Sequence, residues 1–311
     1  MKGDPIDQAF QSRSPYGTRS EPVYSGATSF LRRPYTKELA GVDVAVCGVP
    51  SDLATSNRPG ARFGPRGIRT ASVQLAWGAV WPFGFDPFDR LRVTDWGDVH
   101  FDEGYRDRML DAVERHAALA LDQGASLLTL GGDHLITLPL LRAHARAFGP
   151  LSLVHFDAHS DTWREDTLNH GSMFFHALGE GLLDPQHSVQ IGIRSHNDES
   201  HGFMILDARE VHRVGAAEIA RRVCERVGDR RAYLTFDIDC LDPAFAPGTG
   251  TPVVGGLSSS RAMRILQGIA DLNIVGFDVV EVSPAYDHAQ ITALAGATLA
   301  LQFLYMRASR K

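Results

Sequence analysis

The chain has 311 residues, of which 44% are hydrophobic and 22% charged, a composition typical of one large or two small globular domains. Its net charge of -6 and its pI near 6.1 argue against nucleic acid or an anionic membrane surface as a partner. With three widely spaced cysteines, no apolar run of transmembrane length and no signal-peptide core, we expect a cytoplasmic protein with free thiols.

Residues 1–40 are rich in Ser, Pro, Gly and Arg and contain only scattered apolar positions. We expect these residues to form an irregular arm that lies over the body of the protein or over a neighbouring subunit. Residues 41–311 contain no linker, internal repeat or low-complexity segment. This second region is therefore predicted to form a single domain.

Short apolar segments alternate with amphipathic segments along this domain. The apolar segments are typical of strands covered on both faces, and they span residues 42–49, 91–94, 126–130, 151–156, 188–193, 232–236 and 274–280. The amphipathic segments predict helices over residues 106–123, 217–227, 258–270 and 291–307. Such alternation predicts an α/β fold in which one parallel sheet has helices on both faces.

Polar residues follow three of the predicted strands. The three segments are Leu130-Gly-Gly-Asp-His134, His155-Phe-Asp-Ala-His-Ser-Asp161 and Phe236-Asp-Ile-Asp-Cys240. Alternate side chains of an extended chain share one face, so each segment should present its acids and histidines together. Ligands of such sheets bind beyond the carboxyl ends of the strands, where these three segments should meet.

This group of side chains favours a metal centre, although each member has an ordinary alternative. A single buried histidine usually hydrogen-bonds within the core, and a single aspartate usually caps a turn. Four aspartates in a dry crevice would be strongly destabilising unless cations, or salt bridges to nearby arginines, neutralised them. Oxygen-rich ligands favour Mn²⁺ over zinc. We therefore predict a site for two divalent ions at His134, Asp157, His159, Asp161, Asp237 and Asp239.

Cys240 is adjacent to Asp239 but should face the opposite side of an extended strand, so we assign it to the core. The histidines at positions 116, 144, 187 and 212 lie on amphipathic or loop segments and receive no role.

The three segments resemble the metal-binding motifs of the ureohydrolase family, which includes arginase and agmatinase. Residues 49–56, 138–145, 188–194, 243–253 and 278–287 are also similar to bacterial agmatinases, so the resemblance covers nearly the whole chain from about residue 28. It implies a three-layer α/β/α arginase-type fold around a mostly parallel eight-stranded sheet. It also implies two Mn²⁺ ions per subunit, a homotrimer or homohexamer, and hydrolysis of a small guanidino compound, most readily agmatine, to an amine and urea.

The resemblance also implies individual roles. His134, Asp157, Asp161 and Asp237 would bind one metal ion, and Asp157, His159, Asp237 and Asp239 would bind the other. Asp161 would also carry a proton towards the leaving nitrogen. Glu281 would bind the substrate guanidinium and His170 would exchange protons with solvent, although a salt-bridged glutamate and an exposed loop histidine are the ordinary alternatives.

The far end of the substrate is left to residues 162–169. Trp163 stands where arginases have an asparagine, which weakens the case for arginine as the substrate. Glu165 or Asp166 would suit the ammonium of agmatine, whereas Arg164 would suit the carboxylate of guanidinobutyrate. The alternatives are therefore a guanidinobutyrase or another guanidino-acid ureohydrolase, an arginase, a single-zinc deacetylase of the same fold, or an inactive regulator. The complete set of six ligands disfavours the last two.

Overall fold

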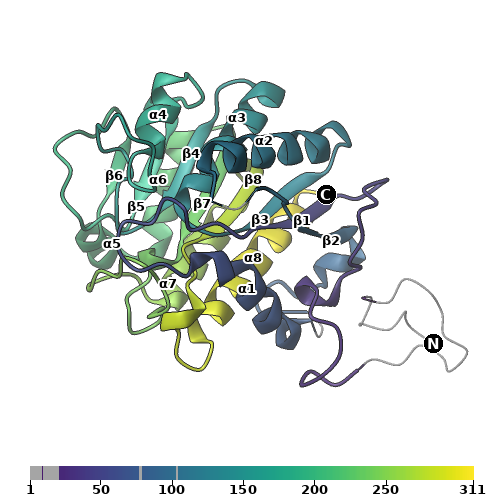
Figure 1. The fold of residues 1–311 in the computed structure, drawn as a ribbon. Coiled ribbons are helices and arrows are strands. Elements are labelled where there is room, and N and C mark those ends of the chain that lie inside the picture. Colours follow the sequence, from purple (N-terminus) through teal and green to yellow (C-terminus); the bar gives the residue numbers. More distant parts are fainter. Residues whose placement is uncertain (1–8, 10–20, 77–78, 103) are drawn as a thin grey trace, which may run out of the picture.

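A computed structural model describes residues 9, 21–76, 79–102 and 104–311 of the chain. In this part of the chain, eight strands form one sheet in the order β2-β1-β3-β8-β7-β4-β5-β6, and all neighbouring strands pair in parallel. Helices cover both faces of the sheet (Figure 1). The structure thereby confirms the three-layer α/β/α fold expected from the sequence.

The strands are mostly buried, as parallel strands covered on both faces should be. Their bounds are β1 (Val44–Val49), β2 (Val93–Asp98), β3 (Ser126–Gly131), β4 (Ser152–Phe156), β5 (Val189–Ile191), β6 (Met204–Leu206), β7 (Arg231–Asp237) and β8 (Asn273–Val280). All except β6 overlap a predicted strand. With only three residues, β6 is too short to show a hydrophobic period.

The helices include all four that the sequence pattern predicts, namely α2, α6, α7 and α8. The bounds are α1 (Gly64–Ser72), α2 (Arg106–Asp122), α3 (Thr137–Phe148), α4 (Met173–Gly179), α5 (Ala208–Val214), α6 (Ala216–Val227), α7 (Ser259–Gly268) and α8 (Ile291–Ser309). Ser258 caps α7 by accepting a hydrogen bond from the backbone N–H of Arg261 over 3.2 Å. The pattern missed the other four helices, α1, α3, α4 and α5, of which α4 and α5 have only seven residues each.

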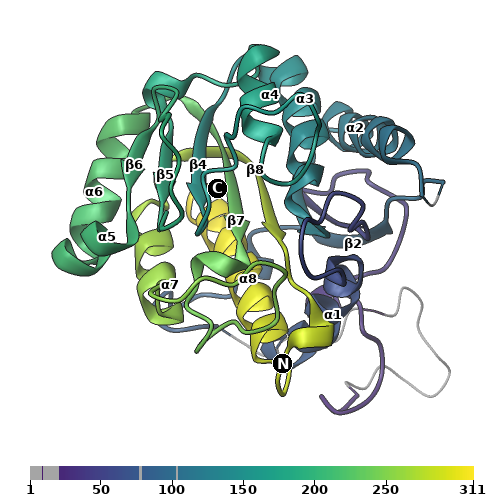
Figure 2. The same ribbon diagram turned by 60° about the vertical axis from the view of Figure 1, so that its left-hand side comes forward.

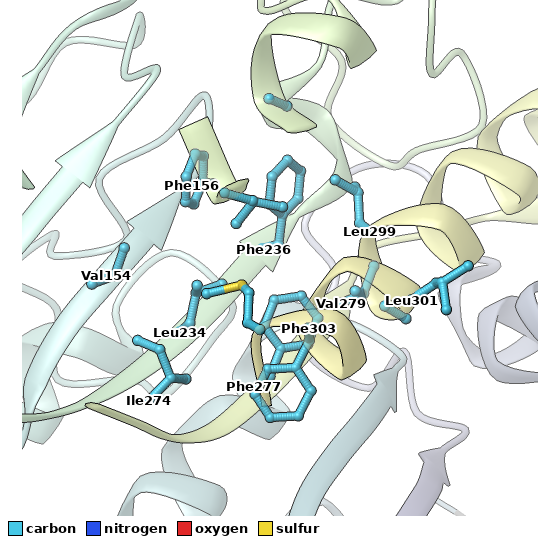
Figure 3. Close-up of a cluster of buried hydrophobic side chains, with 14 of the residues drawn as sticks. Val154, Phe156, Leu234, Phe236, Ile274, Phe277, Val279, Leu299, Leu301 and Phe303 are labelled. Atoms are coloured by element: carbon cyan, nitrogen blue, oxygen red, sulfur yellow. The ribbon is translucent and has the colours of Figure 1, made fainter. Parts of the chain in front are cut away.

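One face of the sheet packs against α8, with α1 and α7 beside that helix (Figures 1 and 2). Aromatic rings fill much of this interface (Figure 3). The ring of Phe277 on β8 stacks on Phe303 of α8 with centroids 5.0 Å apart, and Phe156 stacks on Phe236 at 4.9 Å. This packing fixes β8, β7 and β4 against one rigid helix.

The helix α8 corrects the expectation that the chain contains no apolar run of transmembrane length. It is 19 residues long and contains an 18-residue window with a mean hydropathy of 1.2, so by length and composition alone it could cross a bilayer. However, 72% of its apolar window is buried inside the protein. It is therefore accounted for as a core helix.

The other face of the sheet packs against α2, α3 and α4, with α3 between its two neighbours. Buried residues from these helices form a second apolar cluster with Tyr233 of β7 and Val280 of β8. From α3, the ring of His144 meets the ring of Tyr233 edge-on with centroids 5.0 Å apart. The Thr137 hydroxyl donates to the Asp278 carboxylate over 2.9 Å. A few polar groups therefore sit between α3 and the central strands.

The expected N-terminal arm falls partly outside the described residues, which omit positions 1–8 and 10–20. Within the described portion, Phe30 and Leu31 are buried in the core on the α8 face. The backbone N–H of Phe30 donates to Asp95 over 2.7 Å, and the same carboxylate pairs with buried Arg69 at 2.8 Å. This segment therefore packs on the body of its own chain.

Candidate active site at the carboxyl ends of the central strands

Four adjacent strands in the middle of the sheet supply the candidate residues. The sheet order places β3, β8, β7 and β4 next to one another, although they come from distant parts of the chain (Figure 1). His134 follows the carboxyl end of β3, Glu281 follows β8, Asp237 ends β7 and Asp157 follows β4. The sheet thereby brings the three sequence motifs to one edge, as predicted.

The chain leaves the extended conformation at Asp157, within the β4 motif. The Asp157 carboxylate accepts a hydrogen bond from the backbone N–H of His159 over 2.6 Å, which closes a turn directly after β4. Asp161 then adopts a left-handed backbone with φ of 51°. The expectation that strand alternation aligns these side chains was therefore wrong in its physical reason, because turns beyond the strand aim them inward.

The β7 motif is built in a similar way. Asp237 caps a short 3-10 turn, Ile238–Cys240, by accepting a hydrogen bond from the backbone N–H of Asp239 over 2.7 Å. Cys240 lies in the apolar core, where its thiol donates to the carbonyl of Ile191 over 3.5 Å. The turn therefore directs Asp239 to the site and Cys240 away from it.

His134 stands at the centre of a first group of possible metal ligands. Its Nδ1 lies 2.9 Å from an Asp161 carboxylate oxygen, 3.1 Å from Asp157 and 3.3 Å from Asp237. The structure thus brings together the residues that the sequence analysis assigns to one metal ion.

A chain of hydrogen bonds fixes the orientation of the His134 ring. Its Nε2–H donates to the hydroxyl of Thr235 over 2.8 Å, and Thr235 donates to Asp278 over 2.5 Å. The opposite nitrogen, Nδ1, is buried and makes no hydrogen bond within the described chain. A nitrogen lone pair that faces three carboxylates is suited to a divalent cation, so these residues fit the metal that the sequence predicts.

A second group surrounds His159. Its Nδ1 lies 3.1 Å from an Asp239 carboxylate oxygen and 3.3 Å from Asp157, so Asp157 contributes to both groups. His155 also belongs to the site, with its Nε2 only 2.7 Å from Asp157. The sequence analysis gave His155 no role, because no pattern shows that a strand residue lies against that carboxylate.

The crowded carboxylates create a strongly negative field. Burial, together with the charges of Asp239 and Asp157, raises the pKa of Asp237 well above its ordinary value. Burial lowers the pKa of His159, but the same two carboxylates outweigh burial and raise it to about 12. A field that retains protons this strongly also attracts divalent cations.

Glu281 lies beside the first group of ligands. One of its oxygens, Oε1, accepts hydrogen bonds from the backbone N–H of His134 and from Nδ1 of His170, both over 2.9 Å. The other oxygen, Oε2, is buried and has no hydrogen-bond partner among the described residues. The structure therefore brings Glu281 and His170 into direct contact and leaves one carboxylate oxygen for a ligand.

The protonation of His170 is coupled to Ser56. The backbone N–H of Ser56 donates to His170 Nε2 over 3.1 Å, which in the neutral ring places the proton on Nδ1, facing Glu281. The Ser56 hydroxyl lies 2.7 Å from the same Nε2 and can accept a second ring proton. Burial lowers the pKa of His170, but Glu281 outweighs burial and raises it to about 9. Ser56 lies 114 residues away in sequence, and the sequence analysis did not anticipate its contact with His170.

A cavity of about 590 Å³ opens beside these residues. His159, Asp161, His170 and Asp237 line it together with residues 53–56 and most of the loop after Asp161. Its volume lies within the range of small-molecule sites.

The charged residues of the loop 162–169, which we expect to meet the far end of the substrate, lie partly inside and partly outside the cavity wall. Glu165 lines the cavity together with Trp163, whereas Arg164 and Asp166 do not line it. The Arg164 side chain is 69% exposed and pairs with Glu199 at 3.0 Å. Of the three charged residues that the sequence offers for this contact, only the acidic Glu165 therefore lines the cavity.

Comparison with known proteins defines the class of the enzyme. The family model for the arginase family matches residues 42–306. The chain therefore belongs to the arginase family, and it is a ureohydrolase. It is 55% identical to the agmatinase of Edwardsiella ictaluri over 93% of this chain and 96% of that protein. It is 50% identical to the agmatinase of Chromobacterium violaceum over 98% and 96% of the two chains.

Solved structures agree with this family. A hypothetical agmatinase from Burkholderia thailandensis superposes with a TM-score of 0.95 at 54% identity, over 99% of each chain. Proclavaminate amidino hydrolase from Streptomyces clavuligerus gives a TM-score of 0.89 at 41% identity, over 94% of this chain and 100% of that one. Arginase from Bacillus caldovelox gives 0.74 at 26% identity, over 85% and 98%.

Proposed function

We propose that this ureohydrolase converts agmatine and water to putrescine and urea, with two Mn²⁺ ions per subunit. Relatives that are 50% and 55% identical over nearly the whole chain carry the name agmatinase. The observation that carries the choice of substrate is the position of Glu165 on the cavity wall, whereas Arg164 does not line the cavity and pairs with Glu199. A carboxylate at this position suits a ligand that ends in an ammonium group.

The two groups around His134 and His159 would hold the metal ions, with Asp157 and Asp237 shared. Two divalent ions bound there would lower the pKa of a water molecule to roughly neutral and so supply a strong nucleophile. The protein orients the ligands through the Thr235–Asp278 pair and through the turns after β4 and β7. Asp161 would pass a proton to the leaving nitrogen.

Glu281 would bind the guanidinium through Oε2, the oxygen that is buried and has no partner in the described structure. Because Oε1 is already held by His134 and His170, the carboxylate is oriented before substrate arrives. His170 would carry protons between the site and the solvent-facing cavity, with the Ser56 hydroxyl as its outward partner.

A guanidino acid is the second candidate substrate, and Arg106 favours it. This arginine lines the same cavity, where its guanidinium donates to the carbonyl of Leu168 over 2.6 Å. Its positive charge would suit a carboxylate at the far end of the substrate. A structural neighbour that is 41% identical is named proclavaminate amidino hydrolase.

A substrate panel tests the proposal. After loading with Mn²⁺, urea release is measured with agmatine, arginine, guanidinobutyrate and guanidinopropionate. Agmatine should have the highest kcat/KM, and Glu165→Gln should raise its KM while the matched exposed variant Arg164→Gln leaves it unchanged. Preference for guanidinobutyrate would support the second candidate, and one bound zinc ion without urea release would overturn both.

We also propose that residues 41–311 form the single catalytic domain and that the arm of residues 1–40 contributes to contacts between subunits. A homotrimer or homohexamer in the cytoplasm is the expected form, in keeping with the family resemblance. Light scattering of the purified protein would measure the mass of the assembly and so test the stoichiometry.

A further inference from the structure

His155 and Gln190 form a buried pair beside Asp157. His155 lies on β4 and Gln190 lies on the adjacent strand β5, where the two residues are register partners. His155 Nε2 lies 2.7 Å from Asp157 Oδ2, and its Nδ1 lies 3.0 Å from Gln190 Nε2. His155 is fully buried and Gln190 is 1% exposed, so water does not compete for these contacts.

The carbonyl of Ser160 fixes the orientation of the Gln190 amide. Gln190 Nε2 donates to this carbonyl over 2.6 Å, a position that an amide oxygen could not occupy without repulsion. The amide oxygen of Gln190 is buried and has no hydrogen-bond partner in the described part of the chain. The NH₂ group must therefore be the part of Gln190 that also faces His155.

This orientation determines which nitrogen of His155 carries the proton. Because Gln190 donates to Nδ1, that nitrogen must accept, and the ring proton must lie on Nε2. The Nε2–H then donates to Asp157 Oδ2. A nitrogen that carries a proton has no lone pair for a metal ion, so His155 does not act as a ligand through Nε2 despite its place in the ligand cluster.

We propose that His155, with its tautomer set by Gln190, is a positioning residue that fixes the Asp157 carboxylate. Oδ2 of this carboxylate accepts from His155, and Oδ1 accepts from the backbone N–H of His159. Both oxygens are therefore oriented before a metal arrives. This inference rests on the proposed two-metal function, in which Asp157 is shared by both ions, so the pair should control metal affinity without touching substrate.

Substitutions of His155 test whether this residue acts as a hydrogen-bond donor to Asp157 or as a metal ligand. His155→Gln places an amide NH₂ near the position of Nε2, whereas His155→Phe removes the donor and keeps a ring in the slot beside Phe174. His144→Phe is the matched control, since His144 is also fully buried but packs against Tyr233. Calorimetric titration of the metal-free proteins with Mn²⁺ should show affinity about 10–100-fold weaker for His155→Phe, as for other residues that orient metal ligands. His155→Gln and His144→Phe should remain close to the wild type.

Substitution of Gln190 tests the origin of the tautomer. Gln190→Met removes the donor at similar volume, and Gln302→Met is the control at a glutamine that is 2% exposed on α8. Nitrogen NMR of the metal-free protein should show His155 protonated at Nε2 in the wild type and in Gln302→Met. In Gln190→Met only the Asp157 carboxylate still favours the proton on Nε2, so part of the tautomer population should shift to Nδ1.

The outcomes distinguish this inference from the proposed function. If wild-type protein binds two Mn²⁺ but His155→Phe binds them with unchanged affinity, the positioning role is overturned and the two-metal site stands. Equal losses in His155→Gln and His155→Phe would instead make His155 a ligand. If the wild type binds no Mn²⁺, the proposed function fails, whereas the NMR spectrum still decides whether Gln190 sets the tautomer.

Discussion

The carboxylate of Glu281 accepts a hydrogen bond from the backbone N–H of His134 over 2.9 Å, although 147 residues separate them in sequence. The contact ties the proposed guanidinium anchor to the backbone of a proposed metal ligand. Movement of either residue would therefore disturb the other. Glu281 Oε2 has no hydrogen-bond partner among the described residues, so it is the oxygen left for substrate.

Glu281→Gln should retain bound metal and lose substrate affinity. The carbonyl oxygen of glutamine can accept from His134 and His170 as Oε1 does, while the neutral amide replaces the free oxygen. Loss of charge-assisted hydrogen bonds worth about 1.5–3 kcal/mol each should reduce kcat/KM by about 100-fold. Metal analysis and urea release would be measured together, with the surface variant Glu199→Gln as control. Unchanged KM and kcat would remove Glu281 from the guanidinium site.

Asp239→Ala should abolish turnover, and Cys240→Ala should keep most of it. The 3-10 turn directs Asp239 to His159 at 3.1 Å, whereas the Cys240 thiol is in the core beside Ile191. Metal content by mass spectrometry should fall in Asp239→Ala alone. Loss of metal from Cys240→Ala, in protein with a normal circular dichroism spectrum, would contradict the separation of these neighbours.

Thr235→Val should weaken metal binding because it breaks the link from His134 to Asp278. It leaves the Nε2–H of His134 without its acceptor, at a cost of about 1–3 kcal/mol in unfolding free energy. Mn²⁺ affinity should fall about 10–100-fold because the ring is free to turn. Thr129→Val is the control, since the buried hydroxyl of Thr129 contacts the Cys47 thiol at 3.6 Å. Equal Mn²⁺ affinity in the two variants would show that the link does not orient His134.

The contribution of His144 to stability should fall as pH falls from about 6.5 towards 4. Burial lowers the pKa of His144 from the ordinary 6.5 to about 4. The unfolded chain therefore binds this proton at higher pH than the folded protein, and full protonation should cost about 3 kcal/mol. Denaturant unfolding of metal-free His144→Phe should show stability that rises relative to the wild type as pH falls through this range. The control His196→Gln alters a histidine that is 87% exposed, and its profile should match that of the wild type.

The sequence predicts the elements with strong periodicity and the residues that gather at the site. The 17-residue helix α2 shows its buried stripe plainly, and the apolar strands stand out because both of their faces are covered. By contrast, α1 contains two glycines and a proline and is held by its packing against α8. Such a helix depends on tertiary contacts that no local pattern contains.

The contacts that orient the site are harder to predict than its members. The pairing of Ser56 with His170 and the pairing of Gln190 with His155 depend on which segments the topology places side by side. The alternation rule also failed after β4, because side chain-to-backbone hydrogen bonds turned the chain out of the extended state. Residue chemistry therefore indicates the site, whereas its geometry follows from the order of the strands.

That order has a consequence for how the protein is made. β8 lies between β3 and β7, so the last strand to be synthesised joins two halves of the sheet that are otherwise separate. His134 comes from one half, and the other five proposed ligands, at the end of β7 and after β4 and β7, come from the other. A nascent chain that has not yet released β8 from the ribosome cannot assemble both halves of the site. Metal capture should therefore mark the completion of folding, and bound ions would hold the two halves together across this seam.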